Sequence, residues 1–363
     1  MKKILVLILF AFFSAGSVSA QNTAKSGNII VISIDGLRWK EIFHGAEKQL
    51  ITGKKFNSQD SAQRINKYWA EDQQDRRAKL MPFVWSTIEK NGQLYGNRDL
   101  GSLVNVKNTY WFSYPGRSEN LTGYADPKVN SNDYPDNPNK NVLEFINQQK
   151  GYTKKVVAFA SWDAVARIIN RNRNGMLVNN PFEDLKGSDL TEAEKLANEI
   201  QHYEPKIWGN GERLDATTYA LAKSYIMAKH PKVVYLDLAD TDDQAHEGRY
   251  DFYLDAIHSI DAMIGKLWTY VQNDPFYKNN TTIMIMPDHG RGDGNQWTSH
   301  GASIPHANDT WLMVLGPKVK RLGEVKDNGQ IYQDQYAKTI AGLLGFNFTS
   351  VNPIGDPIPS VVN

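Results

Sequence analysis

The chain has 363 residues, of which 41% are hydrophobic, and its formal net charge at pH 7 is +1. This size allows one large α/β domain or two smaller ones, each with a real core. With no dense Lys/Arg cluster beyond the first residues, the sequence excludes the basic face that a nucleic-acid polymer requires. Cysteine is absent, so any metal site must use His, Asp, Glu or hydroxyl ligands.

The first 20 residues form a segment that differs from the rest of the chain. Lys2-Lys3 precedes an apolar run at residues 4–13, and Ser17-Val18-Ser19-Ala20 offers the small residues of a cleavage site. The run is shorter than the roughly 20 apolar residues that a membrane span needs. We therefore predict a signal peptide at residues 1–20. The mature protein, residues 21–363, is expected to be secreted to a periplasm and to have no membrane span.

Five runs rich in β-branched residues predict buried strands. They lie at residues 28–34, 155–160, 232–238, 282–286 and 311–315. Helical patterns lie between them, at residues 81–91, 191–202, 214–229 and 252–272. This alternation predicts an α/β fold with a central, mostly parallel sheet and helices on both faces. In such a sheet, functional residues lie at the carboxyl ends of the strands.

Three polar stretches interrupt this pattern. Residues 126–140 are rich in Asn, Asp and Pro, and they predict a loop, as do residues 170–183. Residues 57–77 predict a surface helix or loop near the entrance of the site. We find no internal repeat, low-complexity tract or linker, so residues 21–363 are expected to form a single domain.

Two carboxylates follow predicted strands. Asp35 stands directly after the first strand and before Gly36, a place that suits a metal ligand, a turn or a helix N-cap. Asp242 and His246 follow the strand at residues 232–238 and are four residues apart. On a helix, this spacing puts both side chains on one face. The alternative is an ordinary surface pair in an acidic loop.

The strand at residues 282–286 leads to Asp288-His289-Gly290. A carboxylate and an imidazole are costly to bury there unless they are paired or bind a metal ion, so we favour a ligand role. His300 and His306 compete for the last ligand position. We choose His300, because Gly301 after it allows the backbone to pack closely against a site.

Ser113 begins the stretch Ser113-Tyr-Pro-Gly-Arg117-Ser-Glu-Asn-Leu-Thr122-Gly123. A hydroxyl at a helix N-terminus meets free backbone amides and the positive end of the helix dipole, which suits a nucleophile and then a phosphate. The alternative is a simple serine N-cap. Together, the three carboxylates, three imidazoles and one hydroxyl predict a two-metal phosphoester hydrolase.

Taken in order, these motifs resemble the alkaline phosphatase superfamily, particularly its type I phosphodiesterase/nucleotide pyrophosphatase branch. The similarity runs from about Asn28 to the last predicted strands and the final helix. In that family the nucleophile stands nine residues before a Thr-Gly pair, and Ser113 stands nine residues before Thr122-Gly123. The resemblance implies an alkaline-phosphatase-like fold.

The resemblance also implies two Zn²⁺ ions, or other divalent cations, and a small-molecule phosphate ester as substrate. One zinc site would use Asp242, His246 and His300. The other would use Asp35, Asp288 and His289, with Ser113 bridging. Ser113 would attack phosphorus and form a covalent phosphoserine. The oligomeric state and the choice between monoester and diester stay open.

The nucleophile segment departs from the phosphodiesterase pattern, which carries threonine and an Asn-His pair where this chain has Ser113, Gly116 and Arg117. The same segment fits the Ser-x-Pro-x-Arg core that sulfatases convert to formylglycine. A sulfatase using a modified Ser113 is therefore the first alternative. The second is a non-catalytic exported binding protein. Arg117 is a candidate for contact with the substrate oxyanion, because a guanidinium suits tetrahedral oxyanions.

Overall fold

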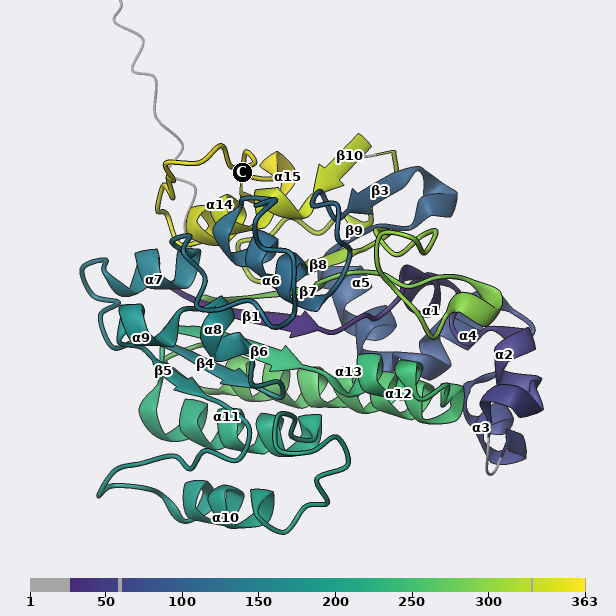
Figure 1. The fold of residues 1–363 in the computed structure, drawn as a ribbon, viewed down its shortest axis with the longest axis horizontal. Helices are drawn as coiled ribbons and strands as arrows, with labels where there is room; N and C mark the ends of the chain where they lie inside the picture. The colour runs from purple at the N-terminus through teal and green to yellow at the C-terminus, as the bar shows by residue number, and fades with distance from the viewer. Residues whose placement is uncertain (1–26, 58–60, 328, 363) are drawn as a thin grey trace, which may run out of the picture.

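An eight-stranded sheet forms the centre of the protein in the computed structural model, which describes residues 27–57, 61–327 and 329–362 (Figure 1). The strand order is β5-β4-β6-β1-β7-β8-β2-β9. The strands are β1 (Asn28–Ile34), β2 (Gly92–Tyr95), β4 (Val156–Ala160), β5 (Leu177–Asn179), β6 (Val233–Leu238), β7 (Thr281–Pro287), β8 (Leu312–Leu315) and β9 (Gly323–Glu324). A separate pair joins β3 (Ser102–Asn105) to β10 (Gly329–Tyr332). The predicted signal peptide lies outside the described residues.

The middle of the sheet is parallel. Strand β1 pairs in parallel with β6 on one side and with β7 on the other, and β4 pairs in parallel with β5 and β6. Strand β8 is antiparallel to both β7 and β2. The predicted mostly parallel sheet is confirmed, and the carboxyl ends of β4, β6, β1 and β7 lie along one edge.

Alternate residues of the central strands face two different hydrophobic clusters. In β1, Ile30, Ile32 and Ile34 belong to one cluster, whereas Ile29 and Val31 belong to the other. This pattern explains the continuous apolar runs in the sequence, because a strand covered on both faces has no polar side. The predicted helical cover on both faces is therefore confirmed.

Helices cover the two faces in separate layers (Figure 1). One layer contains α11 (Asp215–Lys229), α12 (Asp240–His246) and α13 (Tyr250–Asn273), together with α1 (Trp39–His44), α2 (Lys48–Thr52), α3 (Ser61–Tyr68) and α4 (Gln73–Leu80). The other contains α6 (Ser113–Thr122), α7 (Val142–Asn147), α8 (Val165–Ile168), α14 (Tyr336–Leu343) and α15 (Pro359–Val362). Helix α10 (Glu192–Gln201) lies outside α11. None of the described helices combines the length and apolar character needed to cross a bilayer.

The predicted helices are found with small changes at their ends. Residues 191–202 contain α10, whose start is a capping box in which Thr191 and Glu194 satisfy each other's backbone amides. Residues 81–91 are helical but include a π-helical stretch, η2 (Val84–Ile88), followed by α5 (Glu89–Asn91). Asp261 of α13 accepts hydrogen bonds from the Phe83 and Val84 amides, which satisfies donors at the start of that stretch.

Of the three polar stretches, residues 170–183 differ from their predicted structure. Residues 126–140 form a loop as predicted, and the described part of residues 57–77 is largely α3 and the start of α4. The prediction of a loop at residues 170–183 is wrong, because this stretch contains α9 (Arg171–Asn174) and β5. Strand β5 has three residues, too few to show an alternating pattern, and it is extended because it pairs with β4.

Candidate metal centre

The carboxyl edge of the parallel strands brings the predicted ligands together. Asp35 directly follows β1, and Asp288 and His289 directly follow β7. Asp242 and His246 lie on α12, the helix that begins just after β6. His300 belongs to the long connection between β7 and β8. Segments that are far apart in the sequence thus meet at one place because they leave the same edge of the sheet.

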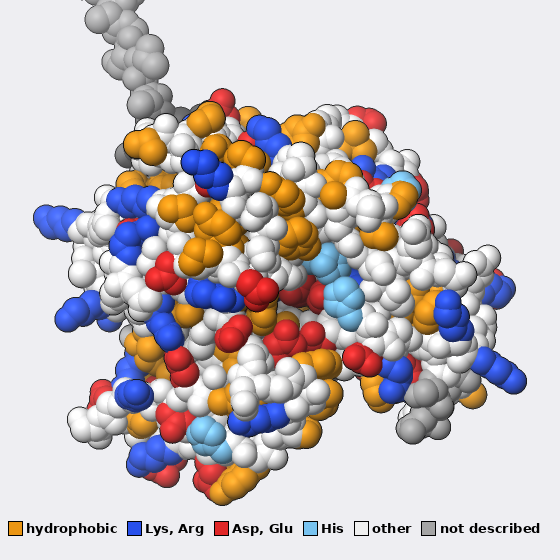
Figure 2. Space-filling view, viewed as in Figure 1, with side chains coloured by type: hydrophobic (Ala, Val, Ile, Leu, Met, Phe, Trp, Pro, Cys, Tyr) orange, Lys and Arg blue, Asp and Glu red, His pale blue; other side chains and the backbone are white. Residues whose placement is uncertain are grey.

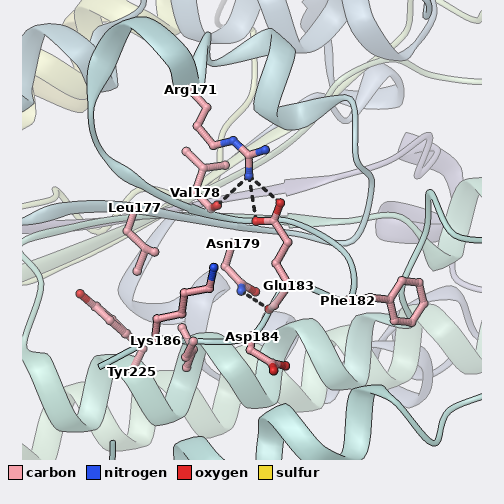
Figure 3. Close-up of a pocket in the computed structure, with 10 residues that line it drawn as sticks. Arg171, Leu177, Val178, Asn179, Phe182, Glu183, Asp184, Lys186 and Tyr225 are labelled. Carbon is pink, nitrogen blue, oxygen red and sulfur yellow. Dashed lines mark hydrogen bonds and ion pairs between the residues drawn. The ribbon is translucent and has the colours of Figure 1, made fainter. Parts of the chain in front are cut away.

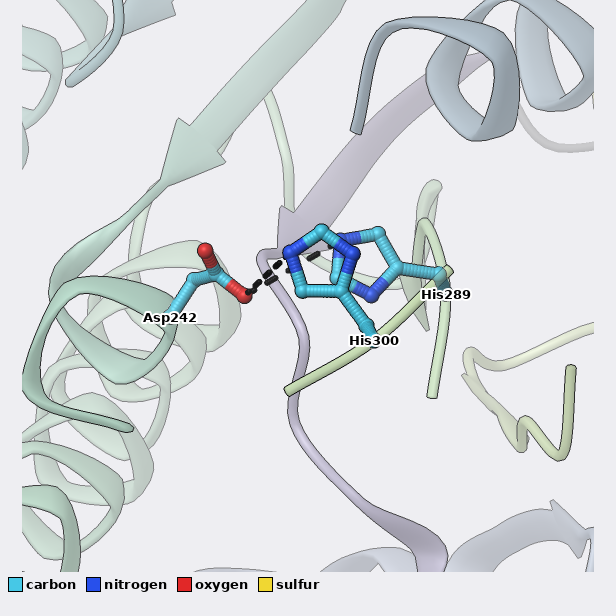
Figure 4. A group of neighbouring side chains, drawn as sticks. All are labelled: Asp242, His289 and His300. Atoms are coloured by element: carbon cyan, nitrogen blue, oxygen red, sulfur yellow. Dashed lines mark ion pairs between the residues drawn. The ribbon is translucent and has the colours of Figure 1, made fainter. Parts of the chain in front are cut away.

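Two groups of side chains have ligand atoms that all lie within 4.8 Å of one another. The first group is Asp242, His289 and His300, and the second is Asp35, Asp288 and His289. Figure 4 shows the two imidazoles of the first group facing the Asp242 carboxylate. Nε2 of His289 lies 3.9 Å from Asp242 Oδ1 and Nε2 of His300 lies 3.8 Å from the same oxygen, and the two rings stack with centroids 4.0 Å apart. His289 therefore lies between the groups.

His246 stands at the rim of the first group. Its Nε2 lies 3.0 Å from Asp242 Oδ2 and 2.9 Å from His300 Nε2, and its side chain is 48% exposed. The resemblance places His246 in a ligand set with Asp242 and His300, whereas the tighter grouping has His289 in that position. His246 thus lies beside the first group, in contact with two of its members, Asp242 and His300.

His306, the competing candidate, lies apart from this cluster. Its Nδ1 is 3.0 Å from Asp309 Oδ2, its Nε2 is 3.9 Å from Asp293, and its side chain is 55% exposed. It lines a different surface pocket together with His44 and Asp99. The structure thus brings His300, and not His306, to the predicted ligands.

Ser113 is the first residue of α6 and is buried at the edge of both groups. Its hydroxyl donates to Asp35 Oδ1 at 3.4 Å, and its Oγ lies 3.2 Å from His289 Nε2. In this first turn the Tyr114 amide donates to Asn132, and Pro115 has no amide hydrogen. The free backbone amides expected beside Ser113 are therefore not found at Tyr114 and Pro115. Ser113 still lies at the positive end of the helix, in contact with the second ligand group.

Two glycines allow the backbone to approach the ligands. A Cβ atom on Gly36 would lie 2.4 Å from Asp242 Oδ1, and Gly36 has a φ of +56°, a value that favours glycine. A Cβ atom on Gly116 would lie 2.2 Å from the carbonyl oxygen of Asp288. Larger residues at either position would displace a ligand-bearing segment.

Arg117 is fully buried among three carboxylates. Its Nε lies 2.7 Å from Asp237 and its Nη2 lies 2.9 Å from Asp35, while its Nη1 donates to Asp288. Its guanidinium thus connects the ligand carboxylates of the second group. The oxyanion contact stays a prediction, because every ion-pair partner of Arg117 in the described residues is a protein carboxylate.

The sequence motifs did not identify two charged residues of the centre, Asp237 and Arg291. Asp237 is completely buried inside β6 and holds Arg117, and its signal was a carboxylate in the middle of an apolar strand. Arg291 donates to Asp242 and to the carbonyl oxygens of Trp297 and Thr298. Its only signal was its position two residues after His289.

Burial and neighbouring charges shift the pKa values of the cluster in opposite directions. Burial raises the pKa of Asp35, but the Arg117 guanidinium and the His289 imidazole together outweigh this effect and leave the pKa below its usual value. Burial also acts on Asp288, and its pKa rises to about 7. Burial lowers the pKa of His289, yet the neighbouring Asp288 and Asp35 carboxylates raise it to about 9.

His300 behaves differently, since burial and the nearby His289 lower its pKa to about 3. Its ring is therefore neutral at physiological pH and has one nitrogen available as a ligand. His289, by contrast, must release a proton before it can bind a metal ion, as is general for imidazole ligands.

The donor set fits a pair of divalent cations. Carboxylate oxygen and imidazole nitrogen are ligands that Zn²⁺ accepts, and the shared His289 makes the two groups neighbours. Figure 2 shows histidine side chains beside a group of acidic side chains in a hollow near the middle of one face of the molecule. The centre is thus open to solvent on one side.

A separate cavity of about 680 Å³ lies beside β5 and contains none of these residues. Figure 3 shows the Arg171–Glu183 ion pair within it, with Leu177 and Tyr225 on its wall. Strands β4 and β6 separate β5 from β1 in the sheet, so we assign this cavity no part in the metal centre.

Comparisons with solved structures agree with this arrangement. The alkaline phosphatase PafA superposes with a TM-score of 0.62 at 9% identity, over 94% of this chain and 99% of that one. A putative sulfatase from Bacteroides thetaiotaomicron gives 0.62 at 12% identity, over 93% and 75%. The phosphonate monoester hydrolase of Agrobacterium radiobacter gives 0.55 at 13% identity, over 93% and 77%. These likenesses confirm the predicted alkaline-phosphatase-like fold.

A comparison with curated protein sequences finds no match. A family model described as the Metalloenzyme superfamily matches residues 34–328, which include every predicted ligand from Asp35 to His300. The predicted kinship with the alkaline phosphatase superfamily is confirmed, while its phosphodiesterase branch stays a prediction. The chain belongs to the Metalloenzyme superfamily.

Proposed function

We propose that the protein is an exported two-metal hydrolase of small phosphate esters in which Ser113 is the nucleophile. The observation that carries this proposal is the position of Ser113 Oγ, 3.2 Å from His289 Nε2 and 3.4 Å from Asp35 Oδ1, at the N-terminus of α6. A buried hydroxyl between a carboxylate and an imidazole that also belong to a ligand group is suited to attack, not to cap a helix.

We assign Asp242, His246 and His300 to one Zn²⁺ and Asp35, Asp288 and His289 to the other, with Ser113 at the second. When bound, such ions act as Lewis acids and lower the pKa of hydroxyl groups that they coordinate. The grouping of Asp35, Asp288 and His289 supports the second site. The first is supported by His246 Nε2, which lies 3.0 Å from Asp242 Oδ2 and 2.9 Å from His300 Nε2. Other divalent cations with the same preference for oxygen and nitrogen ligands would fit the same residues.

The residues of the chain divide the reaction into two displacements. Ser113 Oγ forms a bond to phosphorus while the bond to the leaving alcohol breaks, which gives a phosphoserine. Water then cleaves the phosphoserine ester and releases phosphate, or a phosphomonoester when the substrate is a diester. Arg117 keeps Asp35 and Asp288 in place during both steps, since it bonds to both carboxylates and is completely buried.

A sulfatase remains the second candidate because of one sequence feature. Ser113-Tyr-Pro-Gly-Arg117 fits the Ser-x-Pro-x-Arg segment that is converted to formylglycine in that class. A putative sulfatase is among the structures with the same fold. Against it, the centre gathers three histidines, which suit zinc better than the oxygen-preferring Ca²⁺. A non-catalytic binding protein is disfavoured because the ligand set is complete.

A rate comparison with p-nitrophenyl phosphate, bis-p-nitrophenyl phosphate and p-nitrophenyl sulfate tests the proposal, combined with metal analysis of the purified protein. We expect turnover of a phosphate ester and two zinc ions per chain. One calcium ion with formylglycine at position 113 would support the sulfatase, and a metal-free, inactive protein would support the binding protein. Ser113→Ala should abolish turnover and leave the metal content nearly intact. Unchanged activity in that variant would show that Ser113 is not the nucleophile.

A further inference from the structure

The segment that leads into the nucleophile helix also contacts a predicted metal ligand. The carbonyl oxygen of Trp111, two residues before Ser113, lies 3.3 Å from Nδ1 of His300. Trp111 has a φ of +56°, which is uncommon for a bulky residue and requires support from its surroundings. This backbone conformation turns the Trp111 carbonyl toward the ligand cluster.

Asn108 provides part of that support. Its side-chain Oδ1 accepts hydrogen bonds from the amides of Tyr110, at 2.9 Å, and Trp111, at 3.2 Å. Asn108 is itself buried, with 5% of its surface exposed. Oδ1 of Asn108 thus holds the turn at residues 108–111. Trp111, whose carbonyl contacts His300, is one of the two residues that donate to this oxygen.

Glu119 holds Asn108 in turn. This glutamate lies on α6, six residues after Ser113, and is completely buried. Its carboxylate accepts hydrogen bonds from the Lys107 amide at 2.9 Å, the Asn108 amide at 2.8 Å and the Asn108 side-chain amide at 2.9 Å. The helix that carries the nucleophile therefore also fixes the segment that contacts His300.

The contact with Trp111 determines which nitrogen of His300 is available. A backbone carbonyl can only accept a hydrogen bond, so Nδ1 of His300 carries the proton and Nε2 has the lone pair, which can accept from His246 Nε2 at 2.9 Å or bind a metal ion. Nε2 is the nitrogen that faces the cluster, 3.8 Å from Asp242 Oδ1. Partners of this kind fix the tautomer and ring orientation of metal-binding histidines.

We propose that Asn108 and Glu119 are positioning residues that hold the Trp111 carbonyl against His300 and so present Nε2 of this histidine to a metal ion. The assignment rests on the proposed function in one respect, that His300 is a metal ligand. It links the nucleophile and one metal ligand through a continuous set of hydrogen bonds, because Glu119 and Ser113 share helix α6.

The test uses full-length mature protein and two readouts. The first is the tautomer of His300 in the metal-free state, measured by two-bond ¹H–¹⁵N correlation NMR and assigned with the His300→Gln variant. The second is the affinity for Zn²⁺ in a chelator competition. Asn108→Ala should shift His300 from one tautomer to a mixture and weaken the zinc site that contains it roughly 10- to 100-fold.

Asn141→Ala serves as the matched control. Asn141 is also a buried asparagine whose side chain bonds to backbone groups, at Ile169 and Glu144, but these groups are not in the ligand cluster. If Asn108→Ala does not fold, the milder Asn108→Ser is measured in its place.

An unchanged His300 tautomer, or an equal loss of zinc affinity in Asn141→Ala, would overturn the proposal. Failure of the proposed function is distinguishable, because wild-type protein would then bind no zinc while the tautomer measurement would still report the contact with Trp111.

Discussion

Removal of the Arg117 guanidinium should destabilise the metal-free protein strongly. Its side chain is completely buried and bonds to Asp35, Asp237 and Asp288. Arg117→Met keeps much of the side-chain volume but leaves three buried carboxylates without their shared cation. Loss of one partner from a buried ion-pair network typically costs about 3–5 kcal/mol. We expect a loss of that size in the free energy of unfolding.

In Arg117→Met, a bound metal ion should neutralise some of the three carboxylates but not all of them. Asp35 and Asp288 belong to a ligand group, whereas Asp237 does not. Zinc should therefore stabilise Arg117→Met more than it stabilises the wild type, although it should not restore full stability. Adding Asp237→Asn to Arg117→Met should recover a further part of the loss, because Asp237 makes two of the bonds to the guanidinium.

Urea unfolding of the wild type, both single variants and the double variant, each with a chelator and with zinc, measures these differences as a double-mutant cycle. Arg117→Lys is the charge-matched control, and it should recover only part of the stability because an ammonium cannot reproduce the planar fork. A loss below about 1 kcal/mol for Arg117→Met, a value typical of exposed pairs, would refute the reasoning. So would additive effects of the Arg117 and Asp237 substitutions.

Three further predictions follow from the centre and its surroundings. Gly116→Ala should lower stability by about 1–3 kcal/mol and weaken zinc binding, measured by thermal unfolding and chelator competition, because its Cβ would lie 2.2 Å from the Asp288 carbonyl. Chelation of metal should lower the melting temperature, since ligand at 100 times Kd stabilises by about 2.7 kcal/mol; an unchanged melting temperature would contradict a metal centre. Burial raises the pKa of Glu119 from 4.5 to about 7. A shift of this size changes the free energy of unfolding by about 3 kcal/mol across the pH range that it spans. Between pH 4.5 and about pH 7 the folded state thus binds more protons than the unfolded state, and the free energy of unfolding falls as the pH rises through this range. Urea unfolding from pH 4.5 to 8 should show this fall in the wild type and a smaller one in Glu119→Gln.

The centre of the fold could be predicted because its strands are buried on both faces. Strands β1, β6 and β7 consist almost entirely of apolar residues, and the sequence shows them as continuous runs. Strands β5 and β9 were not predicted because they have three and two residues and owe their conformation to pairing with a neighbour. Local sequence contains too little information on such short edge strands.

Parts of the site followed from the same reasoning. Asp35 and Asp288 could be placed together because the carboxyl ends of parallel neighbours meet at one edge. His300 and His306 could not be separated by spacing, since both lie in one long connection whose path depends on tertiary contacts such as that between His300 and Trp111. Arg291 gave no periodic or motif signal, because its role depends on bonds to Asp242 and to the Trp297 and Thr298 carbonyls.

The two buried arginines explain how so many carboxylates can be gathered before any metal ion binds. Arg117 bonds to Asp35 and Asp288 in one ligand group, and Arg291 bonds to Asp242 in the other. Isolated buried carboxylates would be too costly or would take up protons. In Asp35, Oδ2 bonds to Arg117 while Oδ1 faces Ser113 and His289. The guanidinium therefore orients this carboxylate and leaves one oxygen directed toward the nucleophile, so the second ligand group is arranged by protein contacts alone.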